Sequence, residues 1–245
     1  MKRLVDIFFS FIGLVLLFPI LLVLMFLVWI QDFHSPFFVA RRVGLNGKPF
    51  KMVKLRTMIV NADKNGVMST AGSDTRITRV GKIIRKFKFD ELVQLYNVLI
   101  GEMSLVGPRP NTWKHGVELY TDEEKRLLSV RPGITDISSI VFSNEGEILK
   151  GKKDPDLSYN QLIRPWKSRL GLIYIDGCNV ILDFKIILIT LVAILSRKTA
   201  MSLVVNELKR LNVCEDVISI VLHDNDLVPA PPPGSNQIIT RRHML

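Results

Sequence analysis

The chain has 245 residues, of which 48% are hydrophobic and 23% are charged, and this composition excludes an intrinsically disordered protein. Its formal net charge of +10 at pH 7 predicts an anionic partner: nucleic acid, anionic lipid headgroups or phosphorylated substrates. Its two cysteines have the spacing of neither a metal site nor a disulfide framework, which fits a reducing compartment.

The first predicted element is an apolar segment at residues 7–30 that contains no charged residue. About 20 apolar residues suffice to cross a bilayer, so a single-pass anchor is one alternative. A signal peptide is disfavoured because the segment is too long and no cleavage site follows. Pro19 predicts a kink within the segment, and basic residues at 2–3 and 41–54 place both flanks on the cytoplasmic side. We therefore favour a re-entrant membrane helix-break-helix over residues 1–32.

Short strands and helices are predicted next. The Asn-Gly pair at 46–47 is a strong hairpin signal, and residues 50–53 have the pattern of a second strand. Residues 61–73 are rich in turn-forming residues and predict a loop. Apolar side chains then recur at helical spacing over residues 77–99, and Gly101 has the position of a helix C-terminal cap.

The second half of the chain predicts further helices. Thr121 followed by three acidic residues predicts a helix start, and residues 144–158 have the composition of a surface loop. The apolar segment within residues 180–195 is too short to span a membrane and predicts a buried or interfacial amphipathic helix. Residues 198–245 predict a small appendage with an extended, proline-rich tail. A compact domain would then occupy residues 33–197, in an α+β fold that is mainly helical.

An adjacent carboxylate pair, Asp90 and Glu91, is the first candidate for chemistry. Neighbouring residues on a helix point about 100° apart, yet both can border one site. One carboxylate could then act as a nucleophile and the other as a ligand of a hard cation. The alternative is an exposed acidic pair on a basic surface helix.

Rigidly presented cations are the second candidate. Arg109 lies between two prolines, Arg131 precedes another, and Lys54 lies close to the apolar segment. Proline fixes the local backbone, and a fixed guanidinium suits bidentate binding of phosphate oxygens. The alternatives are solvated arginines in turns and a lysine attracted to lipid headgroups. The chain has no Walker loop, no kinase motif set and no His/Cys zinc cluster.

The ordered set of motifs resembles the bacterial sugar transferase family, the small monotopic polyprenyl-phosphate phosphoglycosyl transferases. The likeness covers residues 1–197 and is densest over 74–110. The motifs that carry it are Lys2-Arg3 with Asp6, Arg42-Val43-Gly44-Leu45-Asn46-Gly47, Lys54-Leu55-Arg56-Thr57-Met58, Asp74-Thr75-Arg76-Ile77-Thr78, Asp90-Glu91, Gln94, Asn97-Val98, Gly101, Gly107-Pro108-Arg109-Pro110, Arg131-Pro132-Gly133-Ile134-Thr135 and Leu182-Asp183-Phe184-Lys185.

The resemblance implies a two-step transfer at the cytoplasmic face of the bacterial inner (cytoplasmic) membrane. The aspartate of the pair would attack the β-phosphate of a UDP-sugar and release UMP, and polyprenyl (undecaprenyl) phosphate would then take the phosphosugar from the enzyme. The product would begin the assembly of a surface glycan or a glycoprotein glycan. Mg²⁺ is the implied cofactor. The implied roles are nucleophile for Asp90, magnesium-associated carboxylate for Glu91, and phosphate binding for Lys54, Arg85, Arg109 and Arg131.

The chain departs from the family pattern at three places. Phe18 stands before Pro19 where the family commonly has serine, which bears on the sharpness of the kink. Residues 136–139 read Asp-Ile-Ser-Ser where many members have Gly-Trp-Ala-Gln, so the sugar is expected to differ from that of common members. An acidic residue that some members carry is absent around Gly171.

Two other classes of function remain as alternatives. A non-catalytic basic scaffold at the membrane would tolerate Asp90→Asn, whereas a transferase would not. Nucleic-acid binding would explain the charge, but no recognition motif is evident, so no nucleic-acid partner is expected. The expected partners are therefore a UDP-sugar, polyprenyl phosphate and membrane phospholipids. The sequence leaves the oligomeric state open, a homo-oligomer included.

Overall fold

The computed structural model describes residues 1–62, 74–114, 116–222 and 227–240, and these are mainly helical with two small sheets. The mainly helical α+β class is thus confirmed. The loop predicted at 61–73 lies, beyond its first two residues, outside the described residues. The elements in chain order are α1 (Lys2–Ile30), β1 (Phe37–Val43), η1 (Leu45–Gly47), β2 (Pro49–Leu55), α2 (Arg79–Lys86), η3 (Phe89–Glu91), α3 (Gln94–Ile100), β3 (Ser104–Val106), η4 (Val117–Leu119), η5 (Glu124–Ser129), β4 (Gly133–Thr135), α4 (Ile137–Val141), α5 (Glu145–Ile148), α6 (Pro155–Ser158), η6 (Tyr159–Ile163), α7 (Arg164–Gly177), α8 (Val180–Leu195), α9 (Arg197–Arg210) and α10 (Glu215–Leu222).

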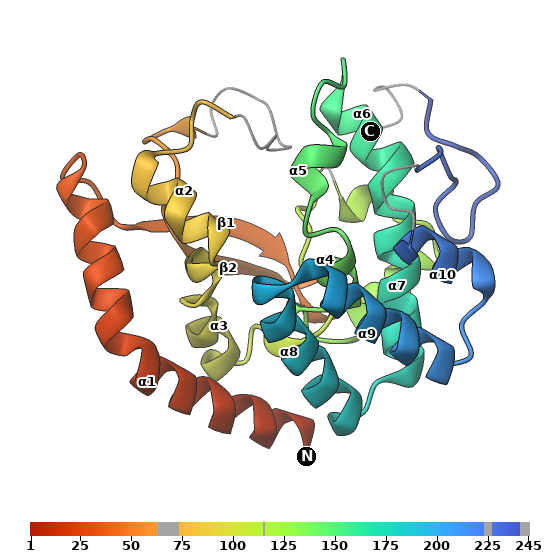
Figure 1. Cartoon of the computed structure of the whole chain (residues 1–245), viewed down its shortest axis with the longest axis horizontal. Coiled ribbons are helices and arrows are strands. Elements are labelled where there is room, and N and C mark those ends of the chain that lie inside the picture. The colour runs from red at the N-terminus through yellow and green to blue at the C-terminus, as the bar shows by residue number, and fades with distance from the viewer. Residues whose placement is uncertain (63–73, 115, 223–226, 241–245) are drawn as a thin grey trace.

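The N-terminal helix α1 is one continuous helix with Pro19 inside it, and its axis bends along its length (Figure 1). The predicted helix-break-helix is corrected to this extent: the chain stays helical across Pro19, because proline removes only one backbone donor. By length and composition α1 could cross a membrane, and 17% of its most apolar window is buried. Several of its apolar side chains, among them Phe8, Leu16 and Val23, are more than half exposed.

Both ends of α1 are fixed to the remainder of the chain. At the N-terminal end, Lys2 Nζ donates to Asp183 Oδ2 of α8 at 2.5 Å. Just beyond the C-terminal end, Arg56 donates to both carboxylate oxygens of Asp32 at 2.5 and 2.7 Å. Charge-assisted contacts of this kind hold a helix in one orientation. The two ends of α1 therefore contact the same folded body.

Strands β1 and β2 form the predicted antiparallel hairpin, with Val43 opposite Pro49 at its closed end. Asn46 in η1 has φ 54°, the left-handed conformation that asparagine adopts more readily than most residues. The hairpin prediction is confirmed. In Figure 1 the hairpin lies between α1–α3 on one side and α4–α10 on the other.

The predicted helical stretch 77–99 is divided in the structure. Thr78 caps α2 by accepting a hydrogen bond from the Gly81 amide at 2.9 Å, and Gly101 ends α3 with φ 90°. Between them Lys88 adopts φ 56° and separates α2 from the single turn η3. The prediction of one or two helices is right, but the carboxylate pair lies in η3 and not within a regular helix.

The predicted surface loop at 144–158 is wrong as to structure, because the segment contains the short helices α5 and α6. Asp154 caps α6 by accepting from the Leu157 amide at 3.1 Å, and Pro155 occupies the first helical position. Leu149, directly after α5, is 1% exposed. Local caps and one buried leucine therefore order a stretch whose composition alone indicates a loop.

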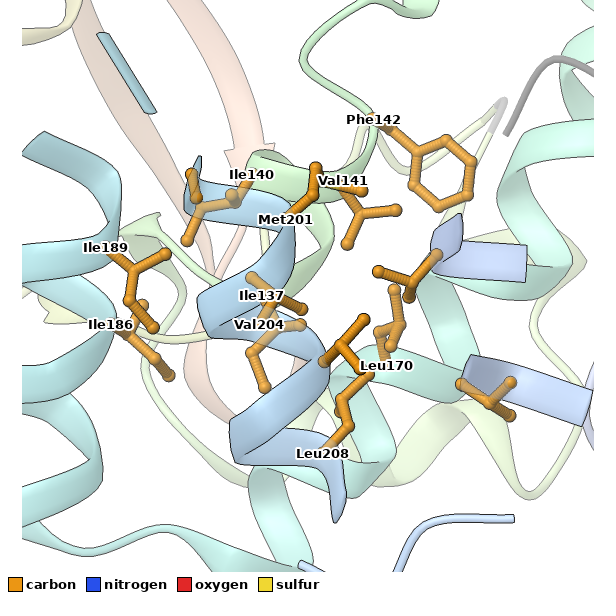
Figure 2. Packing of buried hydrophobic residues seen from close by; sticks show 14 of the residues in the cluster. Ile137, Ile140, Val141, Phe142, Leu170, Ile186, Ile189, Met201, Val204 and Leu208 are labelled. Atoms are coloured by element: carbon orange, nitrogen blue, oxygen red, sulfur yellow. The ribbon is translucent and has the colours of Figure 1, made fainter. Parts of the chain in front are cut away.

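The largest apolar core joins α4, α7, α8, α9 and α10 (Figure 2). Ile140 of α4, Leu170 of α7 and Ile186 of α8 are each 1% exposed, and Leu208 of α9 is fully buried among them. Burying such side chains stabilises a fold by about 1.5–3 kcal/mol each. The predicted appendage from residue 198 onward thus supplies α9 and α10 to this core.

Candidate active site

The carboxylate pair lies between the hairpin and the loop that carries Arg109. Glu91 Oε1 accepts a hydrogen bond from Lys54 Nζ of β2 at 3.0 Å and one from Arg109 Nη2 at 2.7 Å. The Glu91 side chain is 13% exposed, and that of Arg109 is 41% exposed. One carboxylate therefore holds two cations, one of which reaches the surface.

Glu91 and the two cations Lys54 and Arg109 favour each other's charged forms. Burial acts to raise the pKa of Glu91, but Arg109 and Lys54 outweigh burial and hold that pKa well below its usual range. Glu91 in turn is the main reason that the pKa of Arg109 is raised. Burial lowers the pKa of Lys54, and Glu91 opposes this shift. Glu91 and Arg109 are accordingly both ionised at neutral pH.

Asp90 differs from its neighbour. Within the described residues its carboxylate makes no side-chain hydrogen bond, although Lys54, Arg85 and Arg109 all act on it electrostatically. Its pKa is raised, first by burial and then by the adjacent Glu91, while the three cations oppose the rise. A carboxylate that faces cations without being paired to them is available to a ligand.

Backbone contacts between two glycine motifs fix the position of Arg109. The Gly107 amide donates to the Thr135 carbonyl at 3.0 Å, and the Gly133 amide donates to the Pro108 carbonyl at 3.1 Å. A Cβ on Gly133 would lie 2.1 Å from the Gly107 nitrogen, so no larger residue fits this crossing. Together with the flanking prolines, these contacts present Arg109 from a rigid loop.

The remaining predicted cations occupy two different places. Arg85, at the end of α2, donates from Nε to Thr57 Oγ1 at 2.8 Å, and its charge acts on Asp90. Arg131 instead donates from Nε to the Gly101 carbonyl at 2.9 Å, at the C-terminal end of α3. The structure thus brings Lys54, Arg85 and Arg109 together with the carboxylate pair, but not Arg131.

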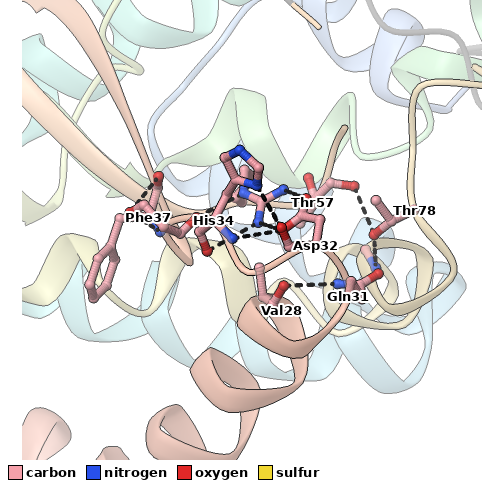
Figure 3. Close-up of polar contacts among 10 residues, drawn as sticks. Val28, Gln31, Asp32, His34, Phe37, Thr57 and Thr78 are labelled. Atoms are coloured by element: carbon pink, nitrogen blue, oxygen red, sulfur yellow. Dashed lines mark hydrogen bonds and ion pairs between the residues drawn. The ribbon is translucent and has the colours of Figure 1, made fainter. Parts of the chain in front are cut away.

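The end of α1 contributes to the placement of Arg85. Arg56, which pairs with Asp32, directly precedes Thr57, the hydroxyl acceptor for Arg85. Figure 3 shows Asp32 and Thr57 among the polar contacts that join this end of α1 to the segment around Thr78. The Thr78 amide also donates to the Thr57 carbonyl at 3.0 Å. Hydrogen bonds therefore connect the C-terminal end of α1 to the residues that position Arg85.

Two further basic residues, Lys88 and Arg42, lie near Arg109 without having been predicted to do so. Burial lowers the pKa of Lys88 and of Arg42, and both lie close enough to Arg109 to interact with it. Lys88 also acts on Glu91. Lys88 lies two residues before Asp90 in the sequence, and this closeness could have identified it. Arg42 had only a motif match. It lies two residues after Ala40 and therefore on the same, core-facing side of β1, and this spacing could have identified it.

The donor set suits a cation that also binds substrate phosphates. The described residues contain no group of three or more His, Cys, Asp or Glu side chains able to hold a metal. Asp90 and Glu91 supply two carboxylates, of which Glu91 is already paired with cations. Mg²⁺ commonly keeps several waters and binds through one or two carboxylates together with phosphate oxygens. The residues fit that mode of binding and not an all-protein cage.

Comparison with known families accords with this arrangement. The sequence model of the family described as bacterial sugar transferase matches residues 1–197. The chain belongs to the bacterial sugar transferase family. The match includes α1, the carboxylate pair and the Arg109 loop, and it ends where α9 begins.

Three individual relatives match much of the chain. The chain is 36% identical over 192 residues to a UDP-glucose:undecaprenyl-phosphate glucose-1-phosphate transferase of Klebsiella pneumoniae, covering 77% of this chain and 39% of the relative. It is 32% identical over 174 residues to a UDP-N-acetylgalactosamine-undecaprenyl-phosphate N-acetylgalactosaminephosphotransferase of Aeromonas hydrophila, covering 67% and 40%. It is 35% identical over 207 residues to the exopolysaccharide production protein PSS of Rhizobium leguminosarum, covering 80% and 96%. The chain thus spans well under half of the first two relatives.

Proposed function

We propose that this chain transfers a sugar 1-phosphate from a UDP-sugar to polyprenyl phosphate at a membrane surface. The observation that carries the proposal is the Asp90 carboxylate, which has no hydrogen-bond partner among the described side chains, beside a glutamate that is held ionised by Lys54 and Arg109. The names of the relatives, which join UDP-sugars to undecaprenyl phosphate, support the same donor and acceptor. The proposed product would begin the assembly of a surface glycan or a glycoprotein glycan.

The transfer proceeds in two displacements at one phosphorus atom. An Asp90 oxygen forms a bond to the β-phosphorus of the donor, and the bond from that phosphorus to the bridging oxygen breaks, so UMP leaves with the electron pair. An oxygen of the lipid phosphate then bonds to the same phosphorus, and the bond to Asp90 breaks. The enzyme returns unchanged, with polyprenyl diphosphate-sugar as the product.

The neighbouring residues stabilise charge during both displacements. Arg109 and Arg85 lie where they can neutralise the phosphoryl oxygens, whose charge must be balanced before a carboxylate can approach. Glu91 holds both Lys54 and Arg109 in place, because one of its two carboxylate oxygens, Oε1, accepts a hydrogen bond from each. Mg²⁺ held by Glu91 would supply neutralisation of the diphosphate and of the departing UMP.

The helix α1 supports a re-entrant membrane attachment on the cytoplasmic face of the inner membrane. Both of its ends contact one folded body, whereas a spanning helix would place them on opposite sides of the bilayer. Phe9 of α1 contacts Phe184 of α8 at 5.4 Å between ring centroids, so the two helices offer a joined apolar surface. The exposed apolar side chains on them include Phe8, Phe11, Leu16, Val23, Phe26, Ile181, Leu188, Leu191 and Leu195.

Release of UMP tests the proposed function. Membranes that contain the protein are incubated with Mg²⁺, undecaprenyl phosphate and a panel of UDP-sugars, in parallel with the Asp90→Asn variant. The proposal predicts UMP release with at least one sugar and its loss in the variant. Asp122→Asn, an exposed aspartate on the surface, is the matched control and should leave the rate unchanged. Release that survives Asp90→Asn would contradict the role of Asp90 as the nucleophile. No release with any donor would contradict the proposed function and favour a scaffold.

A further inference from the structure

A buried glutamine, Gln94, begins the helix that follows the carboxylate pair. It is 2% exposed, and its side-chain nitrogen Nε2 has no hydrogen-bond partner within the described part of the chain. A buried N–H without a partner has lost its bonds to water and gained none in return, so such groups are rare in folded proteins. Gln94 therefore lowers the stability of the fold unless its amide finds a partner at another stage of the reaction.

The backbone places Gln94 one helical turn after Asp90. Leu92 and Val93, which separate η3 from α3, both have right-handed helical dihedral angles, with φ of −60° and −65°. The Leu95 amide donates to the Leu92 carbonyl at 3.1 Å, so the helical path continues across the junction. Residues four apart on such a path are neighbours, and an Asp-Gln pair at this spacing can form a side-chain hydrogen bond.

A third residue, Asn97, shows which way this face of the helix points. Asp90, Gln94 and Asn97 have the i, i+4, i+7 spacing of one helix face. The Asn97 side chain accepts from a backbone amide of β2 at 3.1 Å and donates to a backbone carbonyl of β2 at 2.8 Å. At the other end of the segment, Glu91 accepts from Lys54, which is also in β2. Gln94 lies between these two contacts and is therefore enclosed between α3 and β2, beside the carboxylate pair.

The two amide side chains of this face differ in how far they are used. Asn97 is 1% exposed, and its Nδ2 also donates to Glu102 Oε2 at 2.6 Å, so both ends of its amide are bonded. Gln94 is as deeply buried, yet its nitrogen is not bonded to any described residue. Asp90, one turn away, likewise has no hydrogen-bond partner among the side chains that the structure describes. A donor without an acceptor and an acceptor without a donor are thus neighbours on one helix face.

We propose that Gln94 is a positioning residue for the nucleophile: in the reacting complex its Nε2 donates a hydrogen bond to one oxygen of the Asp90 carboxylate and leaves the other oxygen to attack phosphorus. The inference rests on the proposed function, since it assumes that Asp90 is the nucleophile. A carboxylate rotates about its Cβ–Cγ bond, and a hydrogen bond to one oxygen fixes the direction of the other. The same bond stabilises the carboxylate when it leaves the phosphosugar in the second displacement.

The test removes the amide without changing the size of the side chain much. Gln94→Met does this at the nitrogen without a partner, and Asn97→Leu makes the matching change at the fully bonded amide. Gln94→Leu is measured alongside, so that the outcome does not depend on the packing of one side chain. UMP release is followed at several donor concentrations, so that kcat and KM are separated. The midpoint of thermal unfolding, Tm, is measured for each variant.

Activity and stability are expected to change independently of each other. In both Gln94 variants kcat should fall about 10- to 100-fold, while KM for the donor changes less than about threefold. Their Tm should equal or exceed that of the wild type, because a buried donor without a partner is removed. Asn97→Leu should instead lower Tm, because it leaves backbone groups of β2 without their partners.

Three results would overturn the inference. The first is a kcat that stays within about twofold of the wild type in both Gln94 variants. The second is a raised KM at an unchanged kcat, which would make Gln94 a donor-binding residue. The third is a Tm lowered as far as in Asn97→Leu, which would make Gln94 a structural residue. A wild type that releases no UMP from any donor would overturn the proposed function, and the inference with it.

Discussion

Two of the glutamates that pair with an arginine, Glu124 and Glu91, have different settings. Glu124 is fully buried, and Arg164 beside it is 4% exposed. Its oxygens accept hydrogen bonds from Arg164 Nη2 at 2.7 Å, from Ser168 Oγ at 2.6 Å and from the Thr121 amide at 3.1 Å. The Thr121 hydroxyl accepts from the Glu124 amide in return, which confirms the predicted helix start.

Glu91 uses the same residue types in another way. It too binds an arginine, but Arg109 reaches the surface, and the adjacent Asp90 has no hydrogen-bond partner among the described side chains. At Glu124 three donors saturate one buried carboxylate, and this buried group of hydrogen bonds stabilises the fold. At Glu91, by contrast, Arg109 is 41% exposed and lies beside Asp90, whose carboxylate has no hydrogen-bond partner among the described side chains. A partly exposed cation beside such a carboxylate therefore distinguishes a functional ion pair from a structural one.

Breaking the closed pair should have the largest effect, and on stability. Replacing Glu124 by alanine leaves Arg164 buried without its counter-charge, which typically costs about 3–5 kcal/mol. We expect the free energy of unfolding to fall by this amount in denaturant titrations of the purified protein. Glu118→Ala, an exposed glutamate nearby, should change it little. A loss as small in Glu124→Ala as in Glu118→Ala would show that the closed pair does not stabilise the fold.

Breaking the open pair should instead affect catalysis. Arg109→Ala removes the cation placed nearest to the developing phosphoryl charge, so kcat/KM for UMP release should fall about 100- to 1000-fold. Arg109→Lys should recover part of the loss, because lysine keeps the charge but not the planar fork. Arg126→Ala, at a residue with a comparable 49% exposure that pairs with Asp176, is the control. Equal rates in Arg109→Ala and Arg126→Ala would remove Arg109 from the site.

The charge of Glu91 can be separated from its structural role by the pH dependence of the reaction. After burial, Glu91 is the main cause of the raised pKa of Asp90. A nucleophilic Asp90 must be ionised, so activity is present above its pKa and is lost as the pH falls through it. Glu91→Gln lowers that pKa and should move the acidic limb of the kcat/KM profile to lower pH, with a reduced maximum. Glu118→Gln serves as the control, and an unmoved limb would contradict the coupling.

The smallest expected effect concerns the C-terminal tail. Arg169 Nη2 donates to the Pro231 carbonyl at 2.8 Å, and Thr121 next to the closed pair donates to the Pro233 carbonyl at 2.5 Å. Losing the Arg169 contact should destabilise the tail by about 1 kcal/mol. Limited proteolysis should then cut residues 227–240 faster in Arg169→Ala than in Arg210→Ala, an exposed control. Equal cleavage rates would mean that this contact does not hold the tail.

Local signals explain how much of the fold could be predicted. The Asn46 turn, the Thr78 and Thr121 caps and the Gly101 terminus each depend on neighbouring residues, and each is found where it was expected. The break at Lys88 was not predicted, because a lysine in a left-handed conformation has no local signature and is fixed by its surroundings. Helix α6 was also missed, although Asp154 as a cap and Pro155 at the first helical position are local signals of its start.

The residues of the candidate site could be predicted where a short local motif is enough to indicate their role. Arg109 between prolines and the Asp90-Glu91 pair were found this way, and Lys54 joined them through the family resemblance. Arg131 has the same kind of motif, yet its guanidinium turns to the end of α3. The contact of Arg85 with Thr57 joins residues 28 positions apart in the chain, so only tertiary structure reveals it.

The central claim is that Asp90 carries the phosphosugar, and it can be tested without the lipid acceptor. The protein is incubated with Mg²⁺ and its preferred UDP-sugar, and UMP release and peptide masses are measured together. The account predicts one UMP per enzyme and the mass of a sugar phosphate on the peptide that contains Asp90, with neither in Asp90→Asn. An enzyme that turns over fully once undecaprenyl phosphate is added, yet shows no UMP release and no modified peptide without it, would contradict the account and indicate direct transfer between the two substrates.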